Sequence, residues 1–343
     1  MSESENGKRQ HGAPATIYDI AKLAGVNPST VSRALTTPGR ISARTEAKIR
    51  AAAAELNYRV NPFARALPTG RTRLLALTIA DITNPVFFDI VRGAEQVAAE
   101  SGYTLVLAES QESSSNEASA LERILPMVDG VIMATTRLSD EEIARLDQEK
   151  PVVLMNRTVD GVVDVVPRLE KGIIAVIDHL AGFGHKRLAY LGGPANSWMN
   201  TKRWDIIMKY CLDKGLSVVE IGPNSPTLVA GKEALDRVRA SGATAVIAYN
   251  DLMAIGLLRQ AADQGIAIPD SLSIVGFDNS FGSDFTTPGL TTVKQPLLEL
   301  GEQAVRKMMA ILDEDAQSEG TSDEAALETE LLVRGSTGPV SGS

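Results

Sequence analysis

Residues 16–35 read TIYDIAKLAGVNPSTVSRAL, and this pattern predicts two short helices on either side of a glycine. Thr16 can cap the first helix, with Asp19 three residues later as a capping box. Gly25 is expected to end this helix, and Asn27 followed by Pro28 is a strong start for a second helix. Apolar residues recur at helical spacing in both segments and give each helix one buried face. They are Ile17, Ile20, Ala21 and Ala24, then Val31, Ala34 and Leu35.

A third helix is expected from residue 42 onward. Ser42 can cap it, and Ile49, Ala52 and Leu56 repeat the helical spacing. Two short helices about a glycine turn, braced by a third, form a helix-turn-helix. The sequence therefore predicts an all-α DNA-binding domain over residues 16–60, preceded by a disordered tail over residues 1–15.

Charge is divided unevenly along the 343 residues. Residues 16–73 contain ten basic and three acidic residues, a net charge of +7. Residues 1–15 are neutral, so residues 74–343 carry −16 of the total of −9. A cationic head can bind nucleic acid, while an anionic body reduces non-specific binding to DNA.

The outward face of the second predicted helix is small and polar except for Arg33. The forked guanidinium of this residue can grip a guanine edge in the major groove. Hydroxyls at Thr16, Tyr18 and Ser32 suit phosphate contacts that fix the register of a protein on DNA. This head is therefore expected to read sequence and not only to pack.

Residues 16–35, together with Ile41-Ser42 and the run Glu55-Leu-Asn-Tyr58, resemble the signature of the lactose-repressor (LacI/GalR) family. The resemblance continues through the body of the chain as far as Gly335. It implies base-reading positions at Pro28, Ser29 and Arg33. It also implies backbone contacts from Thr16, Tyr18, Asn27, Ser32 and Tyr58.

The segment over residues 61–71 is expected to be a hinge. Asn61 and Pro62 can start a helix, but Pro68 and Gly70 stop it within about two turns, which is too short for a stable isolated helix. The resemblance implies a hinge helix that orders on the operator, with Ala64 and Leu67 in the minor groove. Two such leucines from a dimer would kink the duplex at its centre. Pro68 departs from the family pattern and biases the preceding residue away from helical geometry.

From residue 74 the pattern changes to short apolar runs separated by helical stretches. Eight runs are predicted to be buried parallel strands, in two series of four. They are Leu74–Ile79, Thr104–Leu107, Val131–Ala134, Val152–Met155, Leu188–Leu191, Val218–Ile221, Ala245–Ala248 and Ser273–Val275. The predicted fold class is thus an α-helical head and an α/β core of two doubly wound parallel-sheet lobes. Such sheets bind ligands at the carboxyl ends of their strands.

The resemblance implies a core like that of the periplasmic sugar-binding proteins, over residues 72–335. Its first lobe would span about 72–166 and 296–312, and its second about 170–292 and 328–335. Residues 290–295 would cross between the lobes, and residues 336–343 would form a tail. Residues 313–325 are acidic, small and polar, which is typical of a flexible insert.

Polar residues just past the strand ends are the candidates for an effector pocket. Asp81 can accept hydroxyls and Phe87 can stack on a ring, whereas Asp251 is expected to cap a helix. Trp198 fits either the pocket wall or the core. The resemblance adds Arg203 as a ligand contact, but Arg168-Leu169 and Ile206 depart from the family pattern. The full candidate set is Asp81, Phe87, Asn156, Trp198, Arg203, Asn250, Asp278 and Gln295.

Composition excludes several other classes of protein. The sequence has no apolar run long enough to span a bilayer and no secretory h-region. Cys211 is the only cysteine, which favours a reducing cytoplasm, and three scattered histidines make no metal-ligand spacing. No cofactor is expected.

Two other classes of protein are alternatives to a regulator. A solute-binding protein on the same fold would lack the basic head. An enzyme would need a nucleophile, a phosphate-binding glycine loop or an acid–base pair, and none is evident in the sequence. We therefore predict a homodimeric repressor of a pseudopalindromic operator, controlled by a sugar, polyol or nucleoside. Induction and co-repression are both compatible with this prediction.

Overall fold

The structure is a computed structural model that describes residues 15–36, 40–58, 70–313 and 326–340. The chain divides into two compact units, residues 1–73 and 74–343. Several predicted features lie outside the described residues. They are the tail up to residue 14, residues 61–69 of the hinge with Ala64 and Leu67, and residues 314–325 of the insert.

The head contains three helices, α1 (Ile17–Ala24), α2 (Pro28–Thr36) and α3 (Ala43–Glu55). The capping box of Thr16 and Asp19 is formed, and Gly25 ends α1 in the left-handed conformation at φ 66° that the turn requires. Ile20, Val31 and Ile49, one from each helix, are buried together in a small core. The predicted helix-turn-helix is confirmed in its three helices, in the caps at Thr16 and Ser42, and in its buried faces.

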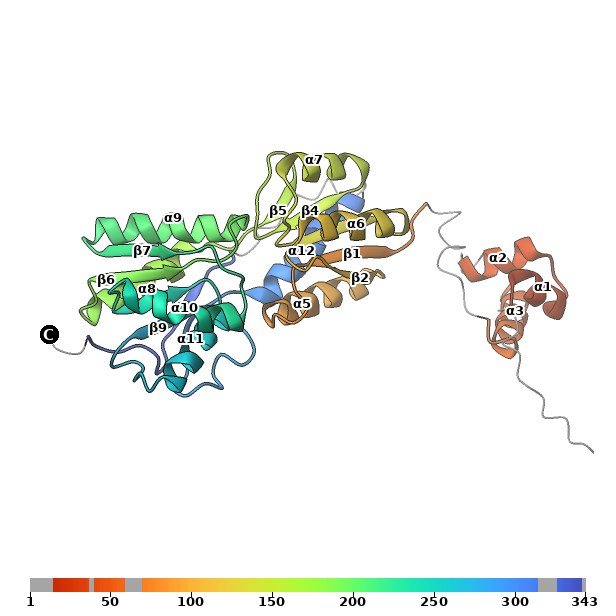
Figure 1. Cartoon of the computed structure of the whole chain (residues 1–343). Coiled ribbons are helices and arrows are strands. Elements are labelled where there is room, and N and C mark those ends of the chain that lie inside the picture. The colour runs from red at the N-terminus through yellow and green to blue at the C-terminus, as the bar shows by residue number, and fades with distance from the viewer. Residues whose placement is uncertain (1–14, 37–39, 59–69, 314–325, 341–343) are drawn as a thin grey trace, which may run out of the picture. The chain divides into compact units, whose positions relative to one another are not determined.

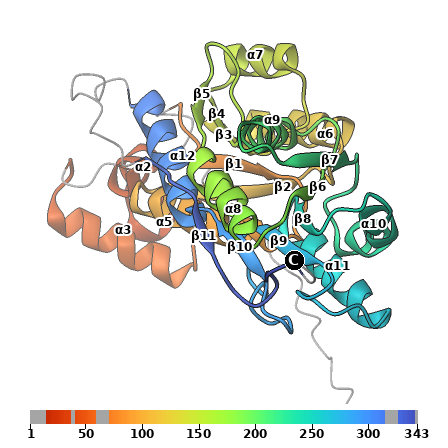
Figure 2. The same cartoon turned by 90° about the vertical axis from the view of Figure 1, so that its left-hand side faces the viewer.

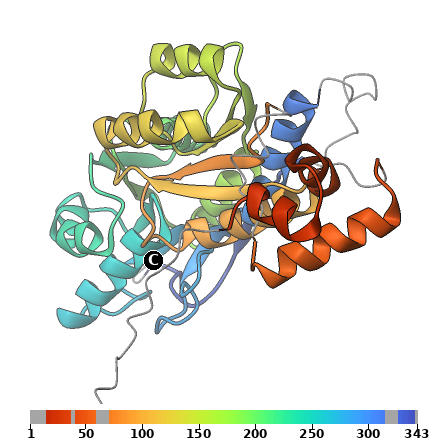
Figure 3. The ribbon, with the colours of Figure 1, turned by 90° about the vertical axis from the view of Figure 1, so that its right-hand side faces the viewer.

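The first lobe is a five-stranded parallel sheet in the order β2-β1-β3-β4-β5. Its strands are β1 (Leu74–Ile79), β2 (Thr104–Glu109), β3 (Gly130–Ala134), β4 (Val152–Met155) and β5 (Val163–Val165). Apolar side chains of α5 (Val86–Glu100) and α12 (Leu297–Leu312) cover one face. Those of α6 (Ser114–Ile124) and α7 (Asp140–Glu149) cover the other, together with the 3-10 turn Leu125–Met127. Figure 3 shows α6 and α7, in yellow tones, on the same side of this sheet.

The second lobe is a six-stranded sheet in the order β11-β10-β9-β8-β6-β7, parallel except for β11. Its strands are β6 (Arg187–Leu191), β7 (Ser217–Ile221), β8 (Ala245–Ala248), β9 (Ser273–Asp278), β10 (Thr291–Lys294) and β11 (Glu330–Leu332). One face is covered by α8 (Glu170–Gly182) and α9 (Trp198–Asp213). The other is covered by α10 (Leu228–Ala240) and α11 (Asp251–Asp263), which Figure 2 shows next to each other.

The chain passes between the lobes three times, after β5, after β10 and after α12 (Figure 1). The first and third passages lie side by side, where Arg168 and Glu328 form a β-bridge and their side chains pair at 3.4 Å. Each lobe is therefore built from separate parts of the chain. This arrangement confirms the two doubly wound lobes predicted from the sequence.

Two of the predicted boundaries are wrong. Residues 291–294, assigned to a crossing, form β10, because they pair with β9 and β11. Residues 336–340, assigned to a tail, are packed into the second lobe. Ser336 is fully buried, and its hydroxyl donates to Ile274 O at 2.6 Å and accepts from Thr291 N at 2.8 Å.

Glycine pairs let two helix pairs cross closely. A Cβ at Gly93 of α5 would lie 2.1 Å from Leu298 O of α12, and one at Gly301 of α12 would lie 2.1 Å from Ile90 O. Gly231 and Gly256 allow the same approach between α10 and α11, with 2.1 Å and 2.2 Å to backbone oxygens. The close approach at Gly93 and Gly301 packs α12 against α5 of the first lobe. The chain reaches α12 only after it has formed most of the second lobe.

Candidate functional site

The head presents its predicted DNA-reading residues to solvent. Ser29 and Arg33 of α2 are exposed and Pro28 is half-buried, while Val31 and Ala34 of the same helix are buried. Exposed basic side chains continue over the head at Lys22, Arg40, Arg44 and Lys48. The structure thus places one polar helix face, with a single arginine, in a basic surrounding.

The predicted backbone contacts have mixed surroundings. Tyr18 is 69% exposed, and Thr16 and Asn27 are also exposed. The Thr16 hydroxyl donates to Asp19 Oδ2 at 2.7 Å, so it serves the capping box. Ser32 is half-buried, and Tyr58 packs partly buried against the core of the head.

Two cavities lie where the lobes face each other. The outer chamber has a volume of about 790 Å³ and is lined by Asp81–Thr83, Glu109, residues 111–112 and the second-lobe segments 194–195 and 223–227. The inner chamber has a volume of about 40 Å³. It is lined by six of the eight candidate effector residues: Phe87, Asn156, Arg203, Asn250, Asp278 and Gln295. Asp81 lines the outer chamber.

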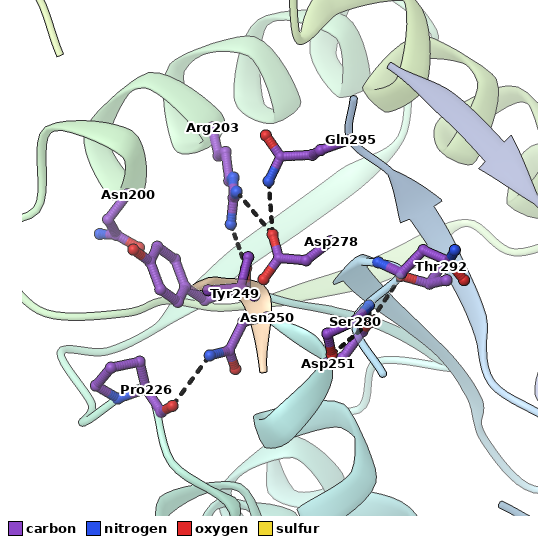
Figure 4. A network of polar contacts seen from close by, with 12 residues as sticks. Asn200, Arg203, Pro226, Tyr249, Asn250, Asp251, Asp278, Ser280, Thr292 and Gln295 are labelled. Atoms are coloured by element: carbon purple, nitrogen blue, oxygen red, sulfur yellow. Dashed lines mark hydrogen bonds and ion pairs between the residues drawn. The ribbon is translucent and has the colours of Figure 1, made fainter. Parts of the chain in front are cut away.

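A buried polar network occupies the second-lobe wall of the inner chamber (Figure 4). Asp278 Oδ1 accepts from Gln295 Nε2 at 2.7 Å and from Arg203 Nη2 at 3.3 Å. Arg203 also donates to Tyr249 O, and its guanidinium carbon lies 3.7 Å from the centroid of the Phe277 ring. Arg203 and Asp278 are only 4% and 5% exposed, so the pair is held away from water.

Three atoms of this inner chamber have no hydrogen-bond partner. They are Asn156 Oδ1, Arg203 Nε and Gln295 Oε1, and all three residues are more than nine-tenths buried. A buried polar atom without a partner costs about 1–3 kcal/mol. The chamber therefore offers one donor and two acceptors to a bound molecule.

Asn250 and Asp251 at the start of α11 have structural roles of their own. Asn250 is the helix cap, accepting from Met253 N at 2.9 Å, so the prediction that Asp251 caps the helix is wrong. Asp251 instead accepts from Ser280 N at 2.7 Å and Thr292 Oγ1 at 2.6 Å. It thereby ties α11 to the loop after β9 and to β10.

Burial raises the pKa of both carboxyls at this place. Burial and the nearby charge of Asp278 raise the pKa of Asp251 to about 8, although its hydrogen bonds oppose the shift. Burial raises the pKa of Asp278 to about 6, with the Arg203 charge acting in the opposite direction. The folded protein thus binds a proton at Asp251 more tightly than the unfolded chain does.

We expect the stability of the core unit to fall as the pH rises from 6.5 to 8.5. A carboxyl with a raised folded-state pKa contributes its full stabilisation below its unfolded pKa and loses it as the pH rises through the folded value. For Asp251 this loss is on the order of 2 kcal/mol across the window, at about 1.4 kcal/mol per pKa unit. Asp251→Asn is expected to flatten the dependence of the urea midpoint on pH, whereas the exposed Asp284→Asn keeps it. An unchanged slope in Asp251→Asn would contradict this assignment.

Left-handed backbone is concentrated around the two chambers. Five non-glycine residues that line them have positive φ: Gln111 (52°), Glu112 (60°), Thr135 (64°), Asn156 (60°) and Asp278 (109°). Such conformations cost about 1–3 kcal/mol each and persist where the surroundings enforce them, often at ligand sites. Each residue follows or ends a strand, so the strain turns these side chains into the cleft between the lobes.

Trp198 does not belong to either chamber. It lies at the start of α9, packed partly buried against the core of the second lobe, and the next residue, Met199, lines the inner chamber instead. Helix α9 begins at Trp198. Met199 and Arg203 are four residues apart, so they lie on the same face of this helix. For Trp198 the core is therefore the correct alternative.

Sequence reasoning missed the ion pair of Glu112 and Arg137. Glu112 Oε2 accepts from Arg137 Nη2 at 2.6 Å and from Nε at 2.8 Å, and the arginine side chain is 3% exposed. Arg137 lies three residues past the end of β3, so the rule that polar residues past a strand end line the cleft would have found it. Glu112 was missed because β2 runs to Glu109, two residues past the predicted end.

Comparisons with known proteins agree with this geometry. The family model "Bacterial regulatory proteins, lacI family" matches residues 16–61, and a "Periplasmic binding protein-like domain" matches residues 177–337. The HTH-type transcriptional repressor CytR of Escherichia coli K12 is 31% identical, covering 96% of this chain and 98% of its own. A lac repressor dimer bound to operator and an anti-inducer has a TM-score of 0.82 at 26% identity, covering 95% of this chain and 100% of its own. The transcriptional regulator CelR in complex with cellobiose has a TM-score of 0.67 at 26% identity, covering 94% and 99%.

A helix-turn-helix head with an exposed basic reading face, followed by a two-lobed core with a polar cleft, defines a DNA-binding transcriptional regulator. The chain belongs to the LacI family of bacterial regulatory proteins. The resemblance noted from residues 16–58 is thereby confirmed.

Within the described parts of the chain, no helix is both long and apolar enough to cross a membrane. The same residues bring no three histidine, cysteine or acidic side chains together as a metal site.

Proposed function

We propose that this chain is a homodimeric repressor whose affinity for a pseudopalindromic operator is set by a small polyhydroxy molecule between the lobes. The single observation that carries the proposal is the buried polar network of Arg203, Asp278 and Gln295. Its three residues line the inner chamber between the lobes, and two of its buried atoms, Arg203 Nε and Gln295 Oε1, have no hydrogen-bond partner among the described residues. The ligand class proposed is a sugar, polyol or nucleoside, and the related CelR structure holds cellobiose. A chain that reads operators works on the chromosome, so we place it in the cytoplasm, without enzymatic activity.

The mechanism is a linkage between the cleft and the operator. Residues of both lobes line each chamber, so a ligand that contacts both walls favours one relative position of the lobes. That position is proposed to reach the operator through β1 of the first lobe, which begins at Leu74, three residues after the segment 61–71 that we propose as the hinge. The ligand acts only through its different affinity for the two states, so the coupling favours either induction or co-repression.

On the operator, we propose that Pro28, Ser29 and Arg33 read base edges in the major groove. Thr16, Tyr18, Asn27, Ser32 and Tyr58 are proposed to hold the phosphate backbone. Ala64 and Leu67 are proposed to enter the minor groove, where paired leucines at the dyad kink the duplex. A dimer in which each head covers one half-site explains why the proposed operator is pseudopalindromic. The lac repressor of the related structure is a dimer on its operator.

Mapping of the DNA sites that the full chain binds tests this proposal. The chain is incubated with genomic fragments of its own organism, and the strongest sites are footprinted at two salt concentrations. We expect discrete sites with two inverted half-sites, protected at both salt concentrations. Diffuse binding that disappears as the salt concentration rises would show only charge attraction and would contradict sequence reading.

A further inference from the structure

The two chambers between the lobes are direct neighbours. Glu112 of the first lobe and Pro226 of the second line both of them. Each of these residues is held in place, Glu112 by Arg137 at 2.6 Å and Pro226 by a hydrogen bond from Asn250 Nδ2 to its carbonyl at 3.0 Å. A ligand that spans both chambers therefore passes between a fixed carboxylate and a fixed proline.

The volumes decide how a ligand divides between the chambers. The inner chamber, at about 40 Å³, holds only about three water-sized groups, because a single water needs about 10–15 Å³ by the same measure. The outer chamber, at about 790 Å³, lies within the range of sites for whole small molecules, roughly 300–1,000 Å³. The body of a ligand thus fits the outer chamber, and one arm of it fits the inner chamber.

The inner chamber favours a ligand that donates more hydrogen bonds than it accepts, because two of its three unsatisfied atoms are acceptors and one, Arg203 Nε, is a donor. Its two arginines are already paired, Arg137 with Glu112 and Arg203 with Asp278. The unsatisfied acceptors Asn156 Oδ1 and Gln295 Oε1 need an O–H or N–H group from the ligand. An ionised phosphate or carboxylate has only acceptors and satisfies neither of them.

The charge of the outer chamber is negative. Its charged lining residues are Asp81, Glu109 and Glu112, and no basic residue is among the described residues that line it. Asp81 Oδ1 accepts from Thr83 Oγ1 at 2.6 Å, and Glu109 Oε1 from Ile82 N at 2.7 Å. Those partners are neutral, so two carboxylate charges face the ligand without a compensating cation.

We infer that the effector is a polyhydroxylated molecule larger than one sugar ring that carries no anionic group. A protonated amine in the outer chamber strengthens its binding. The inference rests on the proposed function, since it specifies which ligand the regulatory cleft takes. It excludes phosphorylated sugars and nucleotides, because their charge meets carboxylates and no free arginine or lysine.

Two ligand series that vary the charge on one scaffold test this inference by calorimetry on the full chain. One is cellobiose, its diamino analogue (the β-1,4-linked dimer of glucosamine) and cellobiose 6′-phosphate. The other is adenosine, 5′-amino-5′-deoxyadenosine and adenosine 5′-monophosphate. In the series that binds, we expect the amine to bind at least as tightly as the neutral compound. The phosphate is expected to bind at least about tenfold more weakly, which corresponds to about 1.4 kcal/mol.

Charge-neutral variants then locate the effect. Asp81→Asn/Glu109→Gln is expected to abolish the preference for the amine and to bring the phosphate within about threefold of the neutral compound, as Coulomb repulsion is removed. The matched pair Glu95→Gln/Glu100→Gln, on exposed positions of α5, is expected to keep the preference of the natural chain.

The outcomes separate this inference from the proposed function. A phosphate that binds as tightly as its neutral counterpart would overturn the charge selection, while ligand control of the operator would stand. If none of the six compounds binds, the inference that the cleft takes a polyhydroxylated effector of this kind would be overturned. In that case, discrete operators in the mapping experiment would still support the DNA-reading half of the proposed function.

Discussion

Arg33→Ala is expected to weaken binding to the mapped operator by about 1–3 kcal/mol, roughly 5- to 150-fold in Kd. The reason is its position: Arg33 is exposed on α2, the helix whose opposite face is buried in the head, and it is the only long cationic side chain on the small polar face. We propose that the guanidinium in this position discriminates guanine from the other bases. The variant is therefore also expected to accept more than one base at a single position of each half-site, measured by competition with operators altered one base pair at a time.

Lys48→Ala is the matched control, because it removes one positive charge from another exposed position of the head. It is expected to lower affinity for all sequences alike and to leave the base preferences unchanged. If Arg33→Ala shows the same uniform loss, with its preferences intact, Arg33 contacts only the backbone.

Arg203→Ala is expected to abolish the response of operator binding to the ligand found in the charge series. It removes the side chain that joins α9 to the carboxylate of Asp278 and to the carbonyl of Tyr249, and it also removes the unsatisfied Nε from the inner chamber. Breaking a buried pair by deleting one partner costs about 3–5 kcal/mol in stability, because the other charge stays buried. The measurement is the operator Kd with and without ligand, after a urea titration has shown that the variant is folded.

Lys202→Ala, an exposed neighbour on the same helix, controls for changes in α9 itself and is expected to respond like the natural chain. Arg203→Met, which keeps much of the packing against Phe277, serves if the alanine variant does not fold. Loss of operator binding by folded, ligand-free Arg203→Met would show that this residue does more than sense ligand.

The helices of the head and the eight main strands were predictable because their signals are local. Caps, a left-handed glycine and helical spacing all fall within residues 16–56, and the central strands are continuous apolar runs with both faces covered by helices. β5 was not predicted, because its three residues include an aspartate and its first residue is exposed. β10 was misassigned because its polar threonines are buried by pairing with strands that sequence reasoning could not place beside it.

The cleft was predictable where the strand-end rule was applied and the strand end was correct. Asp278 and Asn156 follow this rule, and both line the inner chamber. The pairing of Glu112 with Arg137 depends on two loops that meet only in the folded lobe, 25 residues apart. Likewise, Asn250 caps α11 in place of Asp251, because Asp251 is bound to Ser280 and Thr292. Only the tertiary structure brings these two residues to the start of α11.

We propose that a molecule in the cleft changes operator affinity, and the decisive measurement is the operator Kd of the full chain with and without saturating ligand. We expect a shift of about 5–150-fold, the usual range of allosteric coupling, together with an equal shift in ligand affinity when operator is present. An operator Kd that stays constant while calorimetry shows the cleft to be saturated would contradict it.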